Sequence, residues 1–123
     1  MAIGAAAHGV RRGDNMRLDL TVRNGARAGK RLRVGLVCIE RYDVEESSSD
    51  SSTSRETRED IAHEEWTEVD IGVAQQGLSF TIPPDAPFSY RGTCLSFEWR
   101  AEACEIARLR PDPVASFVFE VRP

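Results

Sequence analysis

The sequence contains few cysteines and histidines that could act as nucleophiles or metal ligands. Three cysteines, Cys38, Cys94 and Cys104, and two histidines, His8 and His63, are spread over 123 residues. A zinc site needs three or four nitrogen or sulfur ligands at motif spacing, and these residues show no such spacing. The G-x-S-x-G pattern around a nucleophilic serine is also absent from the sequence. We therefore predict that the chain is not an enzyme and has no catalytic residue, no metal and no cofactor.

The cysteines also bear on the compartment. An odd and low count argues against a disulfide scaffold. In a straight strand, Cys94 and Cys104 would lie far beyond the Cα separation of about 7 Å that a bridge tolerates. We therefore expect reduced thiols and a cytoplasmic protein.

A basic turn is the other feature with chemical potential. Arg23, Arg27, Lys30, Arg31 and Arg33 cluster in and around "NGARAGK". The G-x-x-x-x-G-K-[ST] spacing of a phosphate-binding loop is absent, and a strand pattern follows where that motif requires a helix. The arginines have no interleaved aromatic residue, and an acidic block is available as their internal partner. We therefore predict no nucleic-acid partner.

That acidic block lies in the middle of the chain. Residues 1–42 carry a net charge of +6, whereas residues 43–70 carry −9. From 47 to 54 every residue except Asp50 is serine or threonine. Burial of such side chains cannot offset the entropy lost on ordering them. We therefore expect a disordered, Ser-rich acidic loop at about residues 44–60.

Strands must position any site, because apolar and polar residues alternate over most of the chain. The residues expected to face inward are Met16, Leu18, Leu20, Val22, Leu32, Val34, Leu36, Cys38, Leu78, Phe80, Ile82, Leu95, Phe97, Trp99, Ala101, Ala103, Phe117, Phe119 and Val121. Val37 and Ile39 make residues 31–42 apolar on the second face as well, which indicates that something covers it. Gly35 in this strand indicates a bulge or a close approach of another segment.

Six or seven such strands, with turn signals between them and no helix of normal length, predict the fold. We expect an all-β, immunoglobulin-like antiparallel β-sandwich of about seven strands. The length suits a single domain, which we place at residues 13–123 after a flexible N-terminus at residues 1–12. No stretch approaches the roughly 20 apolar residues that span a bilayer, so we expect no membrane span.

The stretch "SFTIPPDAPFSYRGTCLSFEWRAEA" at residues 79–103 resembles the arrestin-like superfamily. It has a strand ending in F-x-I-P, a D-A-P-x-S-Y-x-G corner and a long strand with an aromatic centre. The earlier "RRGDNMRLDLTVRNG" and the closing "SFVFEVRP" resemble the opening and terminal strands of that superfamily. The resemblance covers residues 10–123. This chain has one sandwich, whereas the superfamily usually pairs two.

The resemblance implies an arrestin-like sandwich of the type found in arrestins and bacterial sporulation-control (SpoOM-like) proteins, which are non-enzymatic scaffolds or adaptors. We therefore expect a bacterial protein-interaction module whose protein partner the sequence does not identify. The residues expected on its interaction surface are Val37, Ile39, Arg31, Arg33, Tyr90 and Arg91. A homodimer through a sheet face or edge is one form of this hypothesis. Two alternatives stay open: a secreted or surface immunoglobulin-like binding module, and a sandwich that binds a small ligand.

Overall fold

The structure is a computed structural model that describes residues 2–21, 31–47, 53–70, 75–106 and 113–123. These ranges contain nine strands and no helix that is long and apolar enough to cross a membrane. The strands are β1 (Ala2–Gly4), β2 (Gly9–Arg11), β3 (Asn15–Thr21), β4 (Arg31–Ser47), β5 (Thr53–Asp70), β6 (Gln75–Thr81), β7 (Tyr90–Arg91), β8 (Leu95–Glu105) and β9 (Pro113–Arg122).

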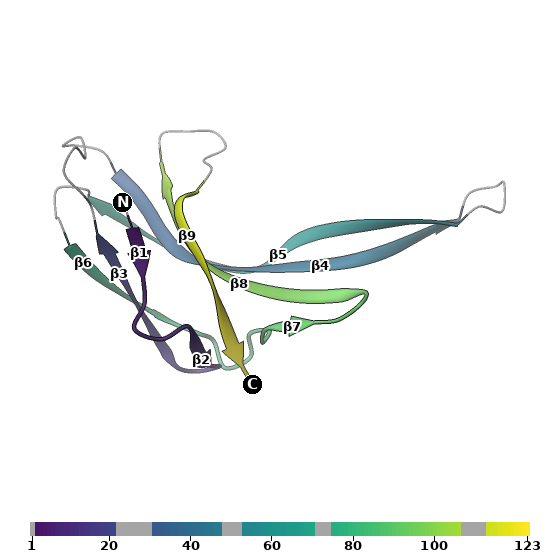
Figure 1. Cartoon of the computed structure of the whole chain (residues 1–123), viewed down its shortest axis with the longest axis horizontal. Coiled ribbons are helices and arrows are strands. Elements are labelled where there is room, and N and C mark those ends of the chain that lie inside the picture. The colour runs from purple at the N-terminus through teal and green to yellow at the C-terminus, as the bar shows by residue number, and fades with distance from the viewer. Residues whose placement is uncertain (1, 22–30, 48–52, 71–74, 107–112) are drawn as a thin grey trace.

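The strands form two sheets that pack against each other (Figure 1). The small sheet has the order β1-β3-β6, and the large sheet has the order β2-β9-β8-β4-β5 with β7 paired to β8. All pairs are antiparallel except β2 with β9. The predicted all-β sandwich is therefore confirmed, with three short strands, β1, β2 and β7, beyond those expected from the sequence.

Alternation along the strands builds the core between the sheets. The largest fully buried side chains are those of Trp99, Leu18, Leu20, Leu32, Leu36, Ile82, Val34, Val121 and Cys38. All of them belong to the faces that the period-two pattern predicts to be inward. Leu95 and Phe97, at the start of β8, are only half-buried, and Val22 lies outside the described residues.

The corner between β6 and β8 is held by hydrogen bonds to both sheets. The backbone of Ile82 accepts from Gly13 and donates to Asp14, at 2.8 and 2.9 Å. The Trp99 indole donates to the carbonyl of Pro87 at 2.9 Å. Ser89 contacts β9 twice, because its amide donates to the Val121 carbonyl and its hydroxyl accepts from the Val121 amide, both at 2.8 Å. The proline-rich segment is therefore a fixed corner of the sandwich.

The N-terminus differs from the flexible segment expected at residues 1–12. β1 pairs with the end of β3, and β2 pairs in parallel with β9. The amide of Glu120 also donates to the carbonyl of His8 at 2.8 Å. Ile3 and Val10 pack against the core. Backbone pairing supplies the order here, and the composition of so short a segment does not reveal it.

The region at about 44–60 also differs from the disordered loop expected there. β4 continues to Ser47 and β5 begins at Thr53, while residues 48–52 lie outside the described ranges. β8 pairs with β4 only as far as Tyr42. Residues 43–47 and 53–57, which we call the arm, therefore project from the sandwich as a two-stranded ribbon (Figure 1).

Polar contacts across the ribbon explain why the charge-rich sequence forms strands. The Thr57 hydroxyl donates to Asp43 at 2.9 Å, and Arg55 pairs with Glu45 at 3.5 Å. Nearer the sandwich, the Tyr42 hydroxyl donates to Asp60 at 2.8 Å. Each exposed pair contributes little, about 0–1 kcal/mol, but their spacing matches the antiparallel register and favours it. Composition alone predicts that these residues are solvated and disordered, and it contains no information on how they pair across the ribbon.

Gly35 and Ala62 shape the β4–β5 pair. A Cβ at Gly35 would overlap the carbonyl oxygen of Glu65 and lie 2.8 Å from the Trp66 ring, so this glycine marks a close approach. The bulge lies elsewhere. Cys38 pairs with His63 and Ile39 pairs with Ile61, which leaves Ala62 as the extra residue of β5.

We expect Gly35→Ala to lower the free energy of unfolding by about 1–3 kcal/mol, because the added methyl meets backbone that cannot move aside easily. Urea unfolding followed by tryptophan fluorescence measures this change. Gly4→Ala is the matched control, since no atom lies within 4 Å of a Cβ built there. Equal stability of the two variants would contradict the close approach at Gly35.

Candidate functional site

The side of the large sheet that points away from the core, here called the outer face, carries most of the residues expected to interact. The strand register aligns them in rows. Three of these rows, read from β8 through β4 to β5, are Glu98–Ile39–Ile61, Arg100–Val37–Glu64 and Glu102–Gly35–Trp66. Apolar side chains therefore gather over β4 and β5, whereas β8 contributes charged ones.

An open depression of about 340 Å³, here called the apolar groove, lies over these rows. Its lining residues are Arg33, Val37, Ile39, Glu59, Asp60, Ile61, Glu64, Trp66, Glu102 and Cys104. Val37 forms part of its floor and is 4% exposed, whereas Ile61 on the edge strand is 61% exposed. Four acids and one arginine accompany the apolar side chains. Glu59 pairs with Arg41 and Asp60 accepts a hydrogen bond from Tyr42, so Glu64 and Glu102 supply the negative charge beside the apolar floor.

Trp66 forms one end of the apolar groove. It is the cross-strand partner of Gly35, and its ring covers the space that a side chain at that position would fill. The guanidinium of Arg33 lies 4.4 Å from the centre of the Trp66 ring. The indole N–H donates to Glu64 at 3.2 Å. The missing side chain at Gly35, the cation–π contact and the hydrogen bond together hold the Trp66 ring flat against the sheet.

Beside the apolar groove, charged side chains form a ridge along the outer face. Glu98 lies 2.6 Å from Arg100 and 3.9 Å from Arg41, and Arg41 also pairs with Glu59. The ridge separates the apolar groove from a second depression on β7, β8 and β9. Because its members neutralise one another, the ridge offers little free charge to a partner.

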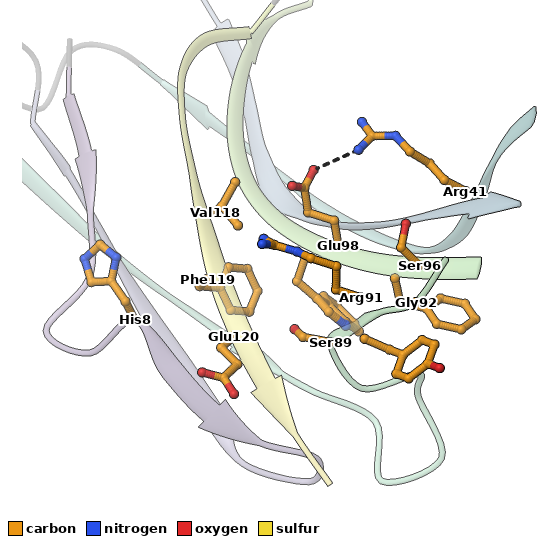
Figure 2. A pocket seen from close by; sticks show the side chains of 13 residues that line it. His8, Arg41, Ser89, Arg91, Gly92, Ser96, Glu98, Val118, Phe119 and Glu120 are labelled. Atoms are coloured by element: carbon orange, nitrogen blue, oxygen red, sulfur yellow. Dashed lines mark ion pairs between the residues drawn. The ribbon is translucent and has the colours of Figure 1, made fainter. Parts of the chain in front are cut away.

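The second depression, here called the fork groove, has a volume of about 800 Å³ and lies where β9 leaves β8. The β8–β9 pairing ends at Trp99 and Phe119, and β7 then pairs with β8 at Phe97 and Ser96. Figure 2 shows Val118 and Glu120 on β9, with Arg91 and Ser96 on the β7–β8 side. The walls of the fork groove mix cationic, acidic and aromatic side chains. They do not indicate one chemical class of ligand.

The structure divides the residues predicted for the interaction surface between these places. Val37, Ile39 and Arg33 line the apolar groove, whereas Tyr90 and Arg91 line the fork groove. Arg31 lines neither groove and instead pairs with Glu68 at 3.2 Å. The prediction therefore named residues of two separate depressions and one residue outside both.

Sequence reasoning missed the β5 half of the apolar groove, which is formed by Ile61, Glu64 and Trp66. One signal was present. Trp66 and Val69 are three positions apart, so in one regular strand they must point to opposite faces. Because Val69 is the residue that enters the core, Trp66 points outward.

The groups that could do covalent or metal chemistry are dispersed. No set of three His, Cys, Asp or Glu side chains within the described ranges could hold a metal ion. His63 packs beside Trp99 with 5.5 Å between ring centres, and His8 packs beside Phe117 at 5.0 Å. The three cysteines are free; Cys38 and Cys104 are buried and Cys94 is exposed.

The comparisons with known proteins concern the fold. No protein-family model matches this sequence, and no curated protein matches it either. Among solved structures, the chain is similar to Spo0M, a sporulation control protein from Bacillus subtilis, with a TM-score of 0.59 and 17% identity. The match covers 98% of this chain and 48% of that one, so this chain spans about half the length of Spo0M. The fold is arrestin-like, as the sequence resemblance implied.

We expect only one of the three thiols to react readily in the folded protein. Burial, with a smaller contribution from Glu40, raises the pKa of Cys38 to about 12, and burial likewise raises the pKa of Cys104. At about pH 8 both stay protonated and shielded, whereas exposed Cys94 reacts. Titration with a thiol-specific chromogenic reagent before and after urea measures the fast-reacting and the slow-reacting thiols. In Cys94→Ser the fast class should disappear, and its persistence would contradict this assignment.

Proposed function

We propose that this chain is a non-catalytic protein-interaction module that binds a protein partner in the apolar groove. The observation that carries the proposal is the exposure of Ile61 beside Val37, Ile39 and Trp66 on a sheet face that is otherwise mostly polar or charged. An isolated exposed isoleucine is unremarkable, but a depression with an apolar floor on a charged face is typical of an interaction site.

The charges around the groove define the chemistry of the partner. Glu64 and Glu102 lie beside the apolar side chains and outside the neutralised ridge, and Arg33 is held against Trp66. A partner segment with one or two large apolar side chains flanked by lysine or arginine complements this arrangement. The apolar side chains would supply affinity, and the basic ones would select the orientation.

Several observations support a scaffold role and a cytoplasmic location in a bacterium. The similarity to a Bacillus sporulation control protein supports an arrestin-like regulatory module. Arginine makes up nearly all of the basic residues, a bias typical of GC-rich bacterial genomes. The exposed free thiol of Cys94 suits a reducing compartment better than an oxidising one.

The two alternatives receive less support. A secreted or surface module would be favoured by a disulfide, and all three cysteines are free. A small ligand inside the sandwich requires space between the sheets, where Trp99, Leu36 and Leu18 are fully buried in the core. Both grooves described above are open depressions at the surface, so they favour a protein partner over an enclosed ligand.

We expect Ile61→Asp to weaken partner binding at least tenfold, because it places a carboxylate in an apolar and already acidic groove. The full chain is immobilised and exposed to an extract of its host, and the proteins that it retains are identified by mass spectrometry. Calorimetry with each purified partner then measures the affinity. Val114→Asp is the matched control, since Val114 is 44% exposed on β9 and lies outside both grooves.

A partner that binds Ile61→Asp as tightly as the unchanged chain would overturn the assignment of the groove. Glu64→Lys provides a second test of the charge argument. It should weaken a partner with basic flanking residues, and the loss should shrink as salt is raised. A stronger interaction with Glu64→Lys would contradict the predicted chemistry of the partner.

A further inference from the structure

The free edges of the two sheets differ sharply in charge. β5 forms an edge of the large sheet, and nine of its 18 residues are charged. β6 forms an edge of the small sheet, and its seven residues contain no charge. The uncharged run extends in the sequence from residue 71 to 84, in a chain that is 29% charged. Natural edge strands usually carry charges that prevent pairing with other chains, and β6 lacks them.

The register shows which backbone groups of β6 are free. Ile82, just after β6, directs both its N–H and its C=O to Gly13 and Asp14, just before β3. Because successive residues of a strand direct these groups to opposite sides, residues 76, 78 and 80 also bond to β3. Gln75, Gly77, Ser79 and Thr81 then direct theirs to the outer edge. No described strand other than β3 pairs with β6.

We infer that two copies of this chain pair through the outer edges of their β6 strands, antiparallel and about a twofold axis at Leu78. Joining the small sheets in this way gives one continuous six-stranded sheet. The surface is independent of the apolar groove, which lies on the outer face of the large sheet. The proposed dimer and the proposed function can therefore be tested independently of each other.

The side chains of β6 fit this arrangement. With the axis at Leu78, Gly77 faces the partner copy's Ser79, and Gln75 faces the partner copy's Thr81. These four residues are uncharged and mostly small, so the paired strands place no like charges directly opposite each other. Leu78 packs against the core yet is only partly buried, and no strand of the described ranges lies on its edge side. A second copy places the same leucine there and extends the core across the axis.

The prolines after β6 limit the pairing to this strand, and Arg17 does not block it. Pro83 and Pro84 follow Ile82 and lack the N–H groups that would lengthen the ladder. On the outer surface the Arg17 guanidinium lies over Gly77, so a Cβ at that glycine would come within 2.6 Å of it. Arg17 pairs with Asp19 at 3.5 Å and leaves the edge itself open.

Sedimentation velocity of the full chain over a wide concentration range tests the inference. We expect a reversible dimer for the unchanged chain and for the control Ser79→Ala. Ser79→Pro should remain monomeric, because it removes an N–H from the free edge while leaving the ladder to β3 intact. Circular dichroism checks its fold. A chain that stays monomeric at the highest concentration, or a dimer that persists in well-folded Ser79→Pro, would overturn the inference.

Charge exchange tests the register without relying on proline. Gln75→Lys with Thr81→Lys places lysine opposite lysine in both outer pairs and should weaken dimerisation at least tenfold. Gln75→Glu with Thr81→Lys places opposite charges there instead and should retain the dimer. In one copy, positions 75 and 81 lie at opposite ends of the strand, so the contrast reports on pairing between copies. Equal behaviour of the two double variants would contradict a twofold axis at Leu78.

Discussion

The buried indole of Trp99 is the contact on which the rest of this sandwich depends. Its ring is fully buried between the sheets, near the Phe119 and His63 rings at 5.9 and 5.5 Å. Its N–H is satisfied by the carbonyl of Pro87, which lies in the corner. An indole N–H left buried without an acceptor costs about 1–3 kcal/mol, so the corner must keep its conformation for the core to remain intact. The fork groove and the pairing of β7 with β8 follow from that conformation.

Much of the fold could be predicted from the sequence because burial repeats every two residues. The inward faces of β3, β6 and β9 follow directly from Leu18, Phe80 and Phe119. Segments ordered by backbone pairing alone could not be predicted in this way. β1 and β2 are three residues each, too short for a period to appear. The arm consists mostly of charged and hydroxyl residues without an apolar alternation, so its strand character is visible only once Asp43 and Thr57 are known to face each other.

For a related reason, only the β4 half of the candidate site could be predicted from the sequence. Val37 and Ile39 can be recognised from the sequence because they interrupt the polar face of an otherwise alternating strand. Ile61 and Trp66 complete the same groove from the neighbouring strand, but their place depends on the register between β4 and β5. Register is a property of two strands together, and a bulge at Ala62 alters it. The uncharged edge of β6, in contrast, can be read from composition once its position in the sheet is known.

The extra residue at Ala62 also divides β5 into two parts that answer to different demands. On one side, Val69 must stay in phase with the core and Trp66 with the outer face. On the other side, residues 53–57 pair, among the described strands, with β4 alone. The extra residue shifts the phase between the two parts by one, so Ile61 on the arm side lies on the same outer face as Glu64 and Trp66. The apolar groove therefore spans the bulge, and a regular strand of the same sequence without the bulge would turn Ile61 toward the inner face.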